Sequence, residues 1–222
     1  MQYYHVSDNS FYTRGFPWIQ HITEGVTSLG ECPVCTAMGW ELSTEITATL
    51  RPDKGSRWPD VLGCGAIASP FIVSGKVLEA WRSEAIGEFP NGRVIIAEPF
   101  PKKLADTEPP DYFWLQGERM EGAKLDLEAS GFVGVQYCPC CGAYSDDIEA
   151  TYDRQHAQVC PYVFVPGTWN GAHLFTTNLS DAAFFCTEAV LDCARKYRLT
   201  NFGFTPIEEG VAAGSKGVKY LK

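Results

Sequence analysis

Two short cysteine motifs carry the clearest chemistry in this chain. One reads Cys32-Pro-Val-Cys35 and the other reads Cys138-Pro-Cys-Cys141-Gly. Each is a Cys-x-x-Cys step, so together their outer cysteines offer four thiolates. Zinc binds four such ligands in a tetrahedron, and a structural site of this kind is closed to substrate. The sequence therefore predicts a structural Zn²⁺ site that joins two distant parts of the chain.

The second motif matches a zinc knuckle more closely than the first. Pro139 favours a turn after the first ligand, and Gly142 allows the backbone conformation that follows the second ligand. The first motif shares the proline but has Thr36 where the glycine would stand. Cys140, inside the second motif, is expected to point away from the metal.

A local site in the second half of the chain is an alternative. Cys138, Cys141, His156 and Cys160 follow the spacing C-x2-C-x14-H-x3-C, which is close to that of a zinc finger. The first motif would then be without metal or redox-active. The substitution Cys32→Ser separates the two arrangements, because it should release zinc from the shared site and leave the local finger intact.

The elements that must position these motifs occur twice in the sequence. Residues 71–82 and 184–195 both read as a short apolar strand, a hydroxyl residue and an amphipathic helix, and a further strand follows each. Ser74 and Thr187 stand at the predicted helix starts. There a side-chain oxygen can accept a hydrogen bond from a free backbone N–H, so both are expected to cap their helices.

A tryptophan and a Cys-x-x-Cys motif precede each of these segments in the same order. We therefore expect an internal duplication, with one unit in residues 1–98 and the other in residues 136–222. Residues 99–135 are rich in proline and are expected to connect the units without a helix. The predicted fold class is α+β: two related strand–helix–strand units in one compact body, with a zinc-ribbon-like pair of knuckles.

Acidic residues outnumber basic ones. The 222 residues contain 27 Asp and Glu against 18 Lys and Arg, which gives a formal net charge of −9. Nucleic-acid binding depends on clustered Lys and Arg that meet phosphates, so we expect no nucleic-acid partner. An acidic body favours a basic protein partner, because complementary charge raises the rate of encounter.

Neither a membrane span nor a secretory signal is predicted. No apolar run reaches about 18 residues, and residues 1–9 lack a basic start followed by an apolar stretch. We therefore expect a cytoplasmic location and no membrane partner. In that reducing compartment the nine cysteines are expected as ligands and core residues rather than disulfides. Cys186 and Cys193 fall at apolar positions of the second helical segment and are predicted to lie in the core.

No catalytic or cofactor-binding residue is predicted. The aromatic stretch of residues 152–173 contains Asp153, His156 and Cys160, which are residue types used in nucleophilic catalysis. Residues so close in sequence rarely converge into a catalytic triad. An enzyme with its site in this stretch is therefore kept as an alternative, which a sizeable pocket there would favour.

The two cysteine motifs, in this order, resemble those of the double-CXXCG motif family of bacteria, first noticed as a paralogous set in myxobacteria. The similarity also covers Leu174–Phe175, Phe184–Phe185 and Leu199–Pro206, so it spans roughly residues 3–208. Members are similar in role to immunity proteins, which protect a cell by binding the cognate polymorphic toxin in a toxin–antitoxin pairing. The resemblance implies metal-ligand roles for the four outer cysteines and a toxin as partner. A zinc-stabilised structural or adaptor protein is the other alternative.

Overall fold

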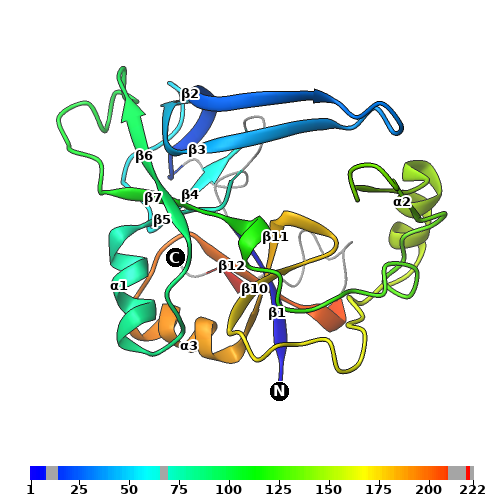
Figure 1. Ribbon diagram of the computed structural model, residues 1–222. Helices are drawn as coiled ribbons and strands as arrows, with labels where there is room; N and C mark the ends of the chain where they lie inside the picture. The colour runs from blue at the N-terminus through cyan, green and yellow to red at the C-terminus, as the bar shows by residue number, and fades with distance from the viewer. Residues whose placement is uncertain (9–14, 66–69, 210–218, 221–222) are drawn as a thin grey trace.

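The architecture combines a closed barrel, an open sheet and a two-stranded ribbon with α-helices (Figure 1). The computed structural model describes residues 1–8, 15–65, 70–209 and 219–220. Mixed strands and helices confirm the predicted α+β class. The barrel is a feature that the sequence analysis did not predict.

Six strands close the barrel, in the order β2–β3–β6–β7–β5–β4. Side chains alternate between its two faces, as in the β6 strand, where Gly92, Val94 and Ile96 are buried between exposed neighbours. Ile46 and Ile72 are fully buried in the same core. The barrel strands are β2 (Trp18–Glu31), β3 (Met38–Leu50), β4 (Val61–Cys64), β5 (Ile72–Ser74), β6 (Asn91–Ala97) and β7 (Tyr112–Leu115).

The open sheet brings together strands from opposite ends of the chain. Its members are β1 (Tyr3–Asp8), β10 (Leu174–Thr177), β11 (Ser180–Thr187), β12 (Phe202–Pro206) and β13 (Lys219–Tyr220). The order is β10–β11–β1–β12–β13, so β1 lies in the middle, antiparallel to both β11 and β12. Phe175, Phe185, Phe202 and Phe204 are fully buried around this sheet. A strand from the first predicted unit is therefore the central strand of the second.

Two helices lie side by side below the barrel (Figure 1). Helix α1 (Gly75–Ser83) connects β5 to β6, and helix α3 (Glu188–Lys196) connects β11 to β12. In both cases the two connected strands flank a third strand, β7 in the barrel and β1 in the open sheet. Both helices are followed by a residue with positive φ, Ala85 at 54° and Arg198 at 51°. The two halves thus share a local arrangement.

The hydroxyl residues at the two helix starts do not act as predicted. Ser74 and Thr187 occupy the N-cap positions, but neither side chain caps its helix. The Ser74 hydroxyl instead donates to Asp60 Oδ1 (3.2 Å), and Thr187 Oγ1 lies 2.9 Å from His173 Nδ1. The capping prediction was wrong because neighbouring segments of the fold offer each hydroxyl another partner.

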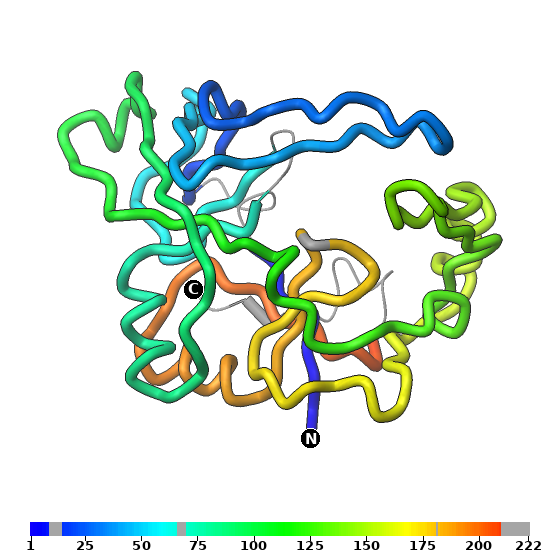
Figure 2. The backbone as a smooth tube through the Cα atoms, viewed as in Figure 1, coloured from blue at the N-terminus to red at the C-terminus, as the bar shows by residue number. Residues whose placement is uncertain are grey.

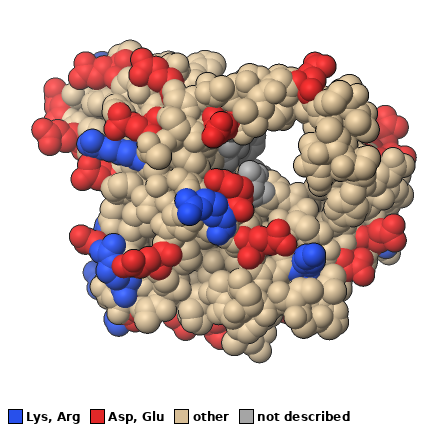
Figure 3. Space-filling view, in the orientation of Figure 1, with Lys and Arg blue, Asp and Glu red and all other residues tan. Residues whose placement is uncertain are grey.

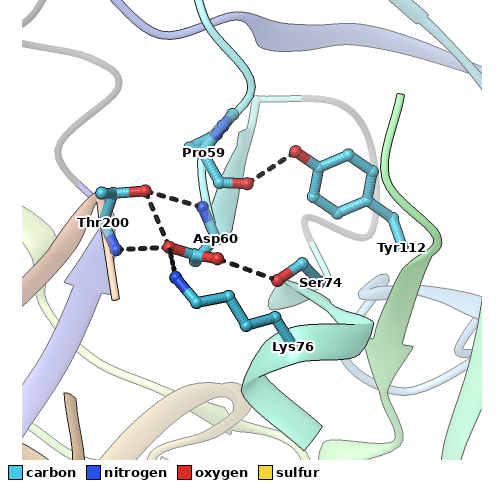
Figure 4. A network of polar contacts seen from close by, with 6 residues as sticks. All are labelled: Pro59, Asp60, Ser74, Lys76, Tyr112 and Thr200. Carbon is cyan, nitrogen blue, oxygen red and sulfur yellow. Dashed lines mark hydrogen bonds and ion pairs between the residues drawn. The ribbon is translucent and has the colours of Figure 1, made fainter. Parts of the chain in front are cut away.

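Asp60 joins the barrel to the open sheet (Figure 4). Its side chain accepts hydrogen bonds from the Thr200 backbone N–H (2.7 Å) and the Thr200 hydroxyl (3.0 Å). The Ser74 hydroxyl and the Lys76 ammonium also donate to this carboxylate, the ammonium at 3.3 Å. Asp60 directly precedes β4, whereas Thr200 lies just before β12. A buried carboxylate is stable only when it is hydrogen-bonded or paired, so these contacts fix the barrel against the sheet.

The remaining elements lie beside the open sheet. The ribbon consists of β8 (Gln136–Tyr137) and β9 (Tyr144–Ser145), and helix α2 (Ile148–Ala157) follows it. Two short 3₁₀ helices span Gly117–Arg119 and Ile207–Glu209. Within the described ranges, no helix has both the length and the apolar character that a membrane crossing requires.

Two cysteines occupy the core, as predicted. Cys186 and Cys193 are 0% and 3% exposed, respectively, and both belong to the cluster shared by α1, α3 and the open sheet. Burial raises the pKa of the Cys193 thiol to about 11, so it stays protonated and packs as a small apolar side chain.

Candidate metal centre

The first cysteine motif lies at the tip of the β2–β3 hairpin. The strands remain paired as far as Glu31 and Met38. Beyond them the Cys32 N–H donates to the Ala37 carbonyl (2.9 Å), and the Thr36 N–H donates to the Cys32 carbonyl (2.9 Å). These two bonds close a tight loop that turns both cysteine side chains to one side.

The second motif repeats this geometry between β8 and β9. The Cys138 N–H donates to the Ala143 carbonyl (2.8 Å), and the Gly142 N–H donates to the Cys138 carbonyl (2.9 Å). Gly142 has φ 72° and Thr36, at the same place in the first loop, has φ 59°. The threonine therefore takes the conformation that the sequence pattern reserves for glycine.

The structure brings the four outer cysteines together. The sulfurs of Cys32, Cys35, Cys138 and Cys141 all lie within 4.8 Å of one another. Two cross-loop pairs are closest, with 3.7 Å between Cys32 and Cys138 and 3.5 Å between Cys35 and Cys141. Zinc–sulfur bonds of about 2.3 Å in a tetrahedron place sulfurs about 3.8 Å apart. The spacing therefore fits a tetrathiolate metal ion.

Backbone N–H groups stabilise charge on the first sulfur of each loop. Those of Cys35 and Val34 lower the pKa of Cys32 to about 6. The equivalent groups of the second loop, Cys141 first, also lower the pKa of Cys138. Because the thiolate is the form that binds a metal, each loop is prepared for ligation before the ion arrives.

The crowding of the sulfurs acts in the opposite direction at Cys35. The Ala37 N–H favours its thiolate, but the neighbouring sulfurs, led by that of Cys141, outweigh this effect and raise the pKa of Cys35 to about 12. The group can therefore not carry four negative charges on its own. A bound cation removes that conflict, because it attracts every thiolate at once.

The alternative ligands of the local finger do not join the group. Among the described residues, only the four outer cysteines of the two motifs make up this cluster. His156 is exposed, stacks on the Tyr152 ring with 3.8 Å between centroids, and its Nδ1 lies 2.9 Å from the Tyr152 carbonyl. Cys160 is buried, and its thiol points to the Arg154 carbonyl (3.9 Å). Cys140 is exposed and is not one of the four cysteines of the group, although the nearby Cys32 sulfur raises the pKa of its thiol.

A long hairpin arm carries the first loop to the second. Within the described part of the chain, β2 pairs with β4 at Trp18 and Ile19, and β3 pairs with β6 from Glu45 to Thr49. The part of the hairpin beyond these pairings, residues 24–44, extends beyond the barrel, and we call it the arm. Its tip reaches the side of the molecule that holds α2 (Figures 1 and 2). The space-filling view shows an opening beneath it (Figure 3), and the tip of the arm meets the β8–β9 loop through the cysteine sulfurs.

A surface hollow lies at the start of the aromatic stretch of residues 152–173. This hollow of about 310 Å³ is lined by Ile148, Glu149, Tyr152 and Asp153, all on helix α2. Sequence analysis did not single out this helix face. The available signal was the pair Ile148 and Tyr152, which are one helical turn apart in a mostly polar helix.

The chain matches no protein-family model, and no curated protein matches it in sequence. The geometry of the cysteine group and of the surface around it therefore carries the functional proposal. Two features stand out: a closed ligand set that joins two loops, and an acidic, partly apolar surface beside it.

Proposed function

We propose that this chain is a zinc-stabilised binding protein and that its partner is a basic protein toxin, which it neutralises as an immunity protein. The observation that carries the zinc role is the convergence of four cysteine sulfurs from two matched loops. Four thiolates satisfy the coordination of Zn²⁺ and leave no position for substrate or an activated water. The ion then has a structural role: it fastens the arm to the body.

The toxin role is supported by charge and by resemblance. Carboxylates outnumber basic groups on the chain, and Figure 3 shows them spread over the face in view. Complementary charge speeds the encounter with a basic protein. The order of the two cysteine motifs resembles that of a family with members similar to immunity proteins. A cytoplasmic location belongs to this proposal, because a thiolate site needs reduced cysteines.

Metal analysis of purified variants tests the zinc site. The wild-type chain should carry about one Zn²⁺, and both Cys32→Ser and Cys138→Ser should lose it, because three thiolates hold the ion poorly. The matched control is Cys140→Ser, in the same loop but outside the group, which should retain zinc. His156→Ala should also retain it. Zinc that survives Cys32→Ser but not His156→Ala would instead establish the local finger.

Cell protection tests the toxin role. A basic protein toxin encoded beside this gene should kill cells that lack the chain and spare cells that express it. Cells poisoned equally with and without the chain would contradict the proposal. The alternative of a structural or adaptor protein rests on the same zinc site and would be favoured by a non-toxic partner that copurifies in a fixed ratio.

We also propose that the two strand–helix–strand units arose by duplication. The cysteine loops, the helices and the residues with positive φ correspond in both halves, and in each half the connected strands flank a third. The third strand follows its unit in the barrel, where β7 comes after β6, and precedes it in the open sheet, where β1 comes before β11. Superposition of α1 with α3 that also overlays β5, β6 and β7 on β11, β12 and β1 would support this origin.

A further inference from the structure

Exposed large apolar side chains are concentrated in two segments of the chain. Among the residues that the structure describes, nine of the eleven large apolar side chains that are exposed fall in residues 29–40 and 137–165. These segments flank the first and the second cysteine loop, respectively. Exposed apolar side chains that are grouped rather than scattered mark surfaces that bind other molecules.

Helix α2 presents the best-defined part of this surface. Its inner side is held by Thr151, whose hydroxyl accepts a hydrogen bond from the Val133 N–H (2.9 Å), and by buried Gln155. Its outer side exposes Ile148 (78%) and Tyr152 (58%). This short, mostly polar helix turns an isoleucine and a tyrosine toward solvent, so its apolar side chains lie on an uncovered face.

Two carboxylates complete that face. Glu149 and Asp153 line the same hollow of about 310 Å³ as the two apolar side chains. The wider surroundings have the same sign of charge, because residues 18–50 and 136–161 together contain eight carboxylates but one Lys or Arg, namely Arg154. Both phosphate groups and anionic lipids are disfavoured by such a surface.

We propose that the outer face of α2 binds a lysine or arginine side chain of a basic protein partner. The aliphatic part of that side chain packs on Ile148 and Tyr152, and its cation meets Glu149 and Asp153. Long basic side chains combine an apolar stem with a charged head, and a tyrosine ring adds attraction for the cation. This site deepens the proposed function, on which it rests, by naming the surface that the partner contacts.

The test titrates isotope-labelled, zinc-loaded full-length protein with a synthetic peptide of interspersed lysines and leucines, followed by NMR. The same peptide with glutamate for lysine is the control probe. The lysine peptide should shift the amide signals of residues 148–153, and the glutamate peptide should not. The double variant Glu149→Gln/Asp153→Asn should weaken binding about five- to tenfold, the effect of losing two exposed ion pairs.

A matched variant separates the effect of this surface on peptide binding from the effect of net charge. Asp106→Asn/Glu108→Gln removes the same charge from two exposed residues of another segment and should leave the affinity within about twofold of wild type. Tyr152→Ala should weaken binding even in high salt, where charge is screened. Equal losses in the two charge variants, or signal shifts away from α2, would overturn the proposal.

Cell protection distinguishes this proposal from the toxin role itself. With the toxin that the wild-type chain neutralises, Glu149→Gln/Asp153→Asn should lose protection while Asp106→Asn/Glu108→Gln keeps it. If wild-type protein gives no protection, the toxin role fails, and the peptide titration still decides whether this face binds basic side chains. Full protection by both variants would show that the partner binds elsewhere.

Discussion

Thr36 occupies a backbone conformation that its side chain disfavours. Its φ of 59° lies in the left-handed region, where a β-branched residue is a rare exception. The side-chain hydroxyl offsets part of the cost by donating to the Cys35 carbonyl (2.7 Å). The first loop therefore reaches the same geometry as the second without the glycine, at some expense in stability.

Replacing this threonine should relieve the strain. We expect Thr36→Gly to stabilise the zinc-loaded protein by up to about 1 kcal/mol, since left-handed backbone costs non-glycine residues about 1–2 kcal/mol and glycine entropy returns part of it. The reciprocal change, Gly142→Thr, should destabilise it by a similar amount. Urea unfolding with zinc in excess measures both. Equal stability of all three proteins would contradict the strain at residue 36.

His5 gives the stability of the fold a dependence on pH. Its ring stacks on Tyr162, with 5.6 Å between centroids, and packs on Phe185, and burial lowers its pKa to about 4. The unfolded chain takes up a proton near pH 6.5, whereas the folded chain does so only near pH 4. Stability should therefore fall as the pH drops from about 6.5 to about 4, because the unfolded state binds more protons in that window.

The contribution of His5 to the pH dependence of stability can be measured as the difference between wild type and a variant. At about pH 5 the loss relative to neutral pH should be no more than about 2 kcal/mol, because the ring keeps some contact with solvent. His5→Phe should remove this component. The free energy of unfolding of wild type and His5→Phe is measured from about pH 6.5 to about pH 4. Zinc ligation changes with pH in both proteins, so the difference between the two curves is the contribution of His5. Parallel curves would rule out a buried neutral His5.

At the level of elements, the arm depends on the cysteine group for its position. Among the described residues, the base of the β2–β3 hairpin is the part paired to other barrel strands, and beyond it β2 and β3 pair with each other. Removing zinc should therefore release the arm while the barrel persists. We expect chelation to speed hydrogen exchange of the amides in residues 24–44 by at least about tenfold.

Two controls define this prediction. Amides of the buried strand segments around Ile46 and Ile72 should keep their protection, and Cys140→Ser should behave as wild type. An arm whose exchange does not change after zinc is removed would show that the ion does not hold it. Exchange that rises throughout the barrel would show that the ion stabilises the whole fold.

The contact between barrel and open sheet depends on Asp60. Asp60→Ala leaves the Thr200 N–H and the Ser74 hydroxyl without their acceptor in an interior position. We expect the loss to be about 3 kcal/mol, the cost of breaking a buried polar network at its centre. Lys76→Met removes only the more exposed contact and should cost less than about 1 kcal/mol. Urea unfolding compares the two variants, and similar losses would contradict this division.

For the molecule as a whole, sequence patterns located the cysteine group but not the barrel. Cysteine spacing carries the chemistry directly, because zinc restricts both the type of ligand and its number. The strand–helix–strand order was visible as well, because the helix segments are amphipathic. The hydroxyl caps failed because the partners of Ser74 and Thr187, Asp60 and His173, come from separate segments.

Barrel closure depends on pairings between strands that lie far apart in the sequence. Trp18 pairs with Gly63, and Glu45 pairs with Arg93, in parallel register. Local propensity cannot specify such partners, since a strand pattern shows which face is buried but not which strand lies beside it. The same limit applies to β1, whose partners β11 and β12 come near the other end of the sequence.

The central place of β1 has a consequence for how the chain is made. Tyr3–Asp8 leaves the ribosome before the six barrel strands, yet its neighbours β11 and β12 are translated after the entire barrel. Domains form as their residues emerge, so the barrel can be complete while β1 is still alone. Tyr4 and Val6, each 3% exposed at the end, are then open to water or to chaperones. Newly made molecules therefore pass through a stage in which the barrel is folded and β1, with apolar side chains exposed, has no paired strand.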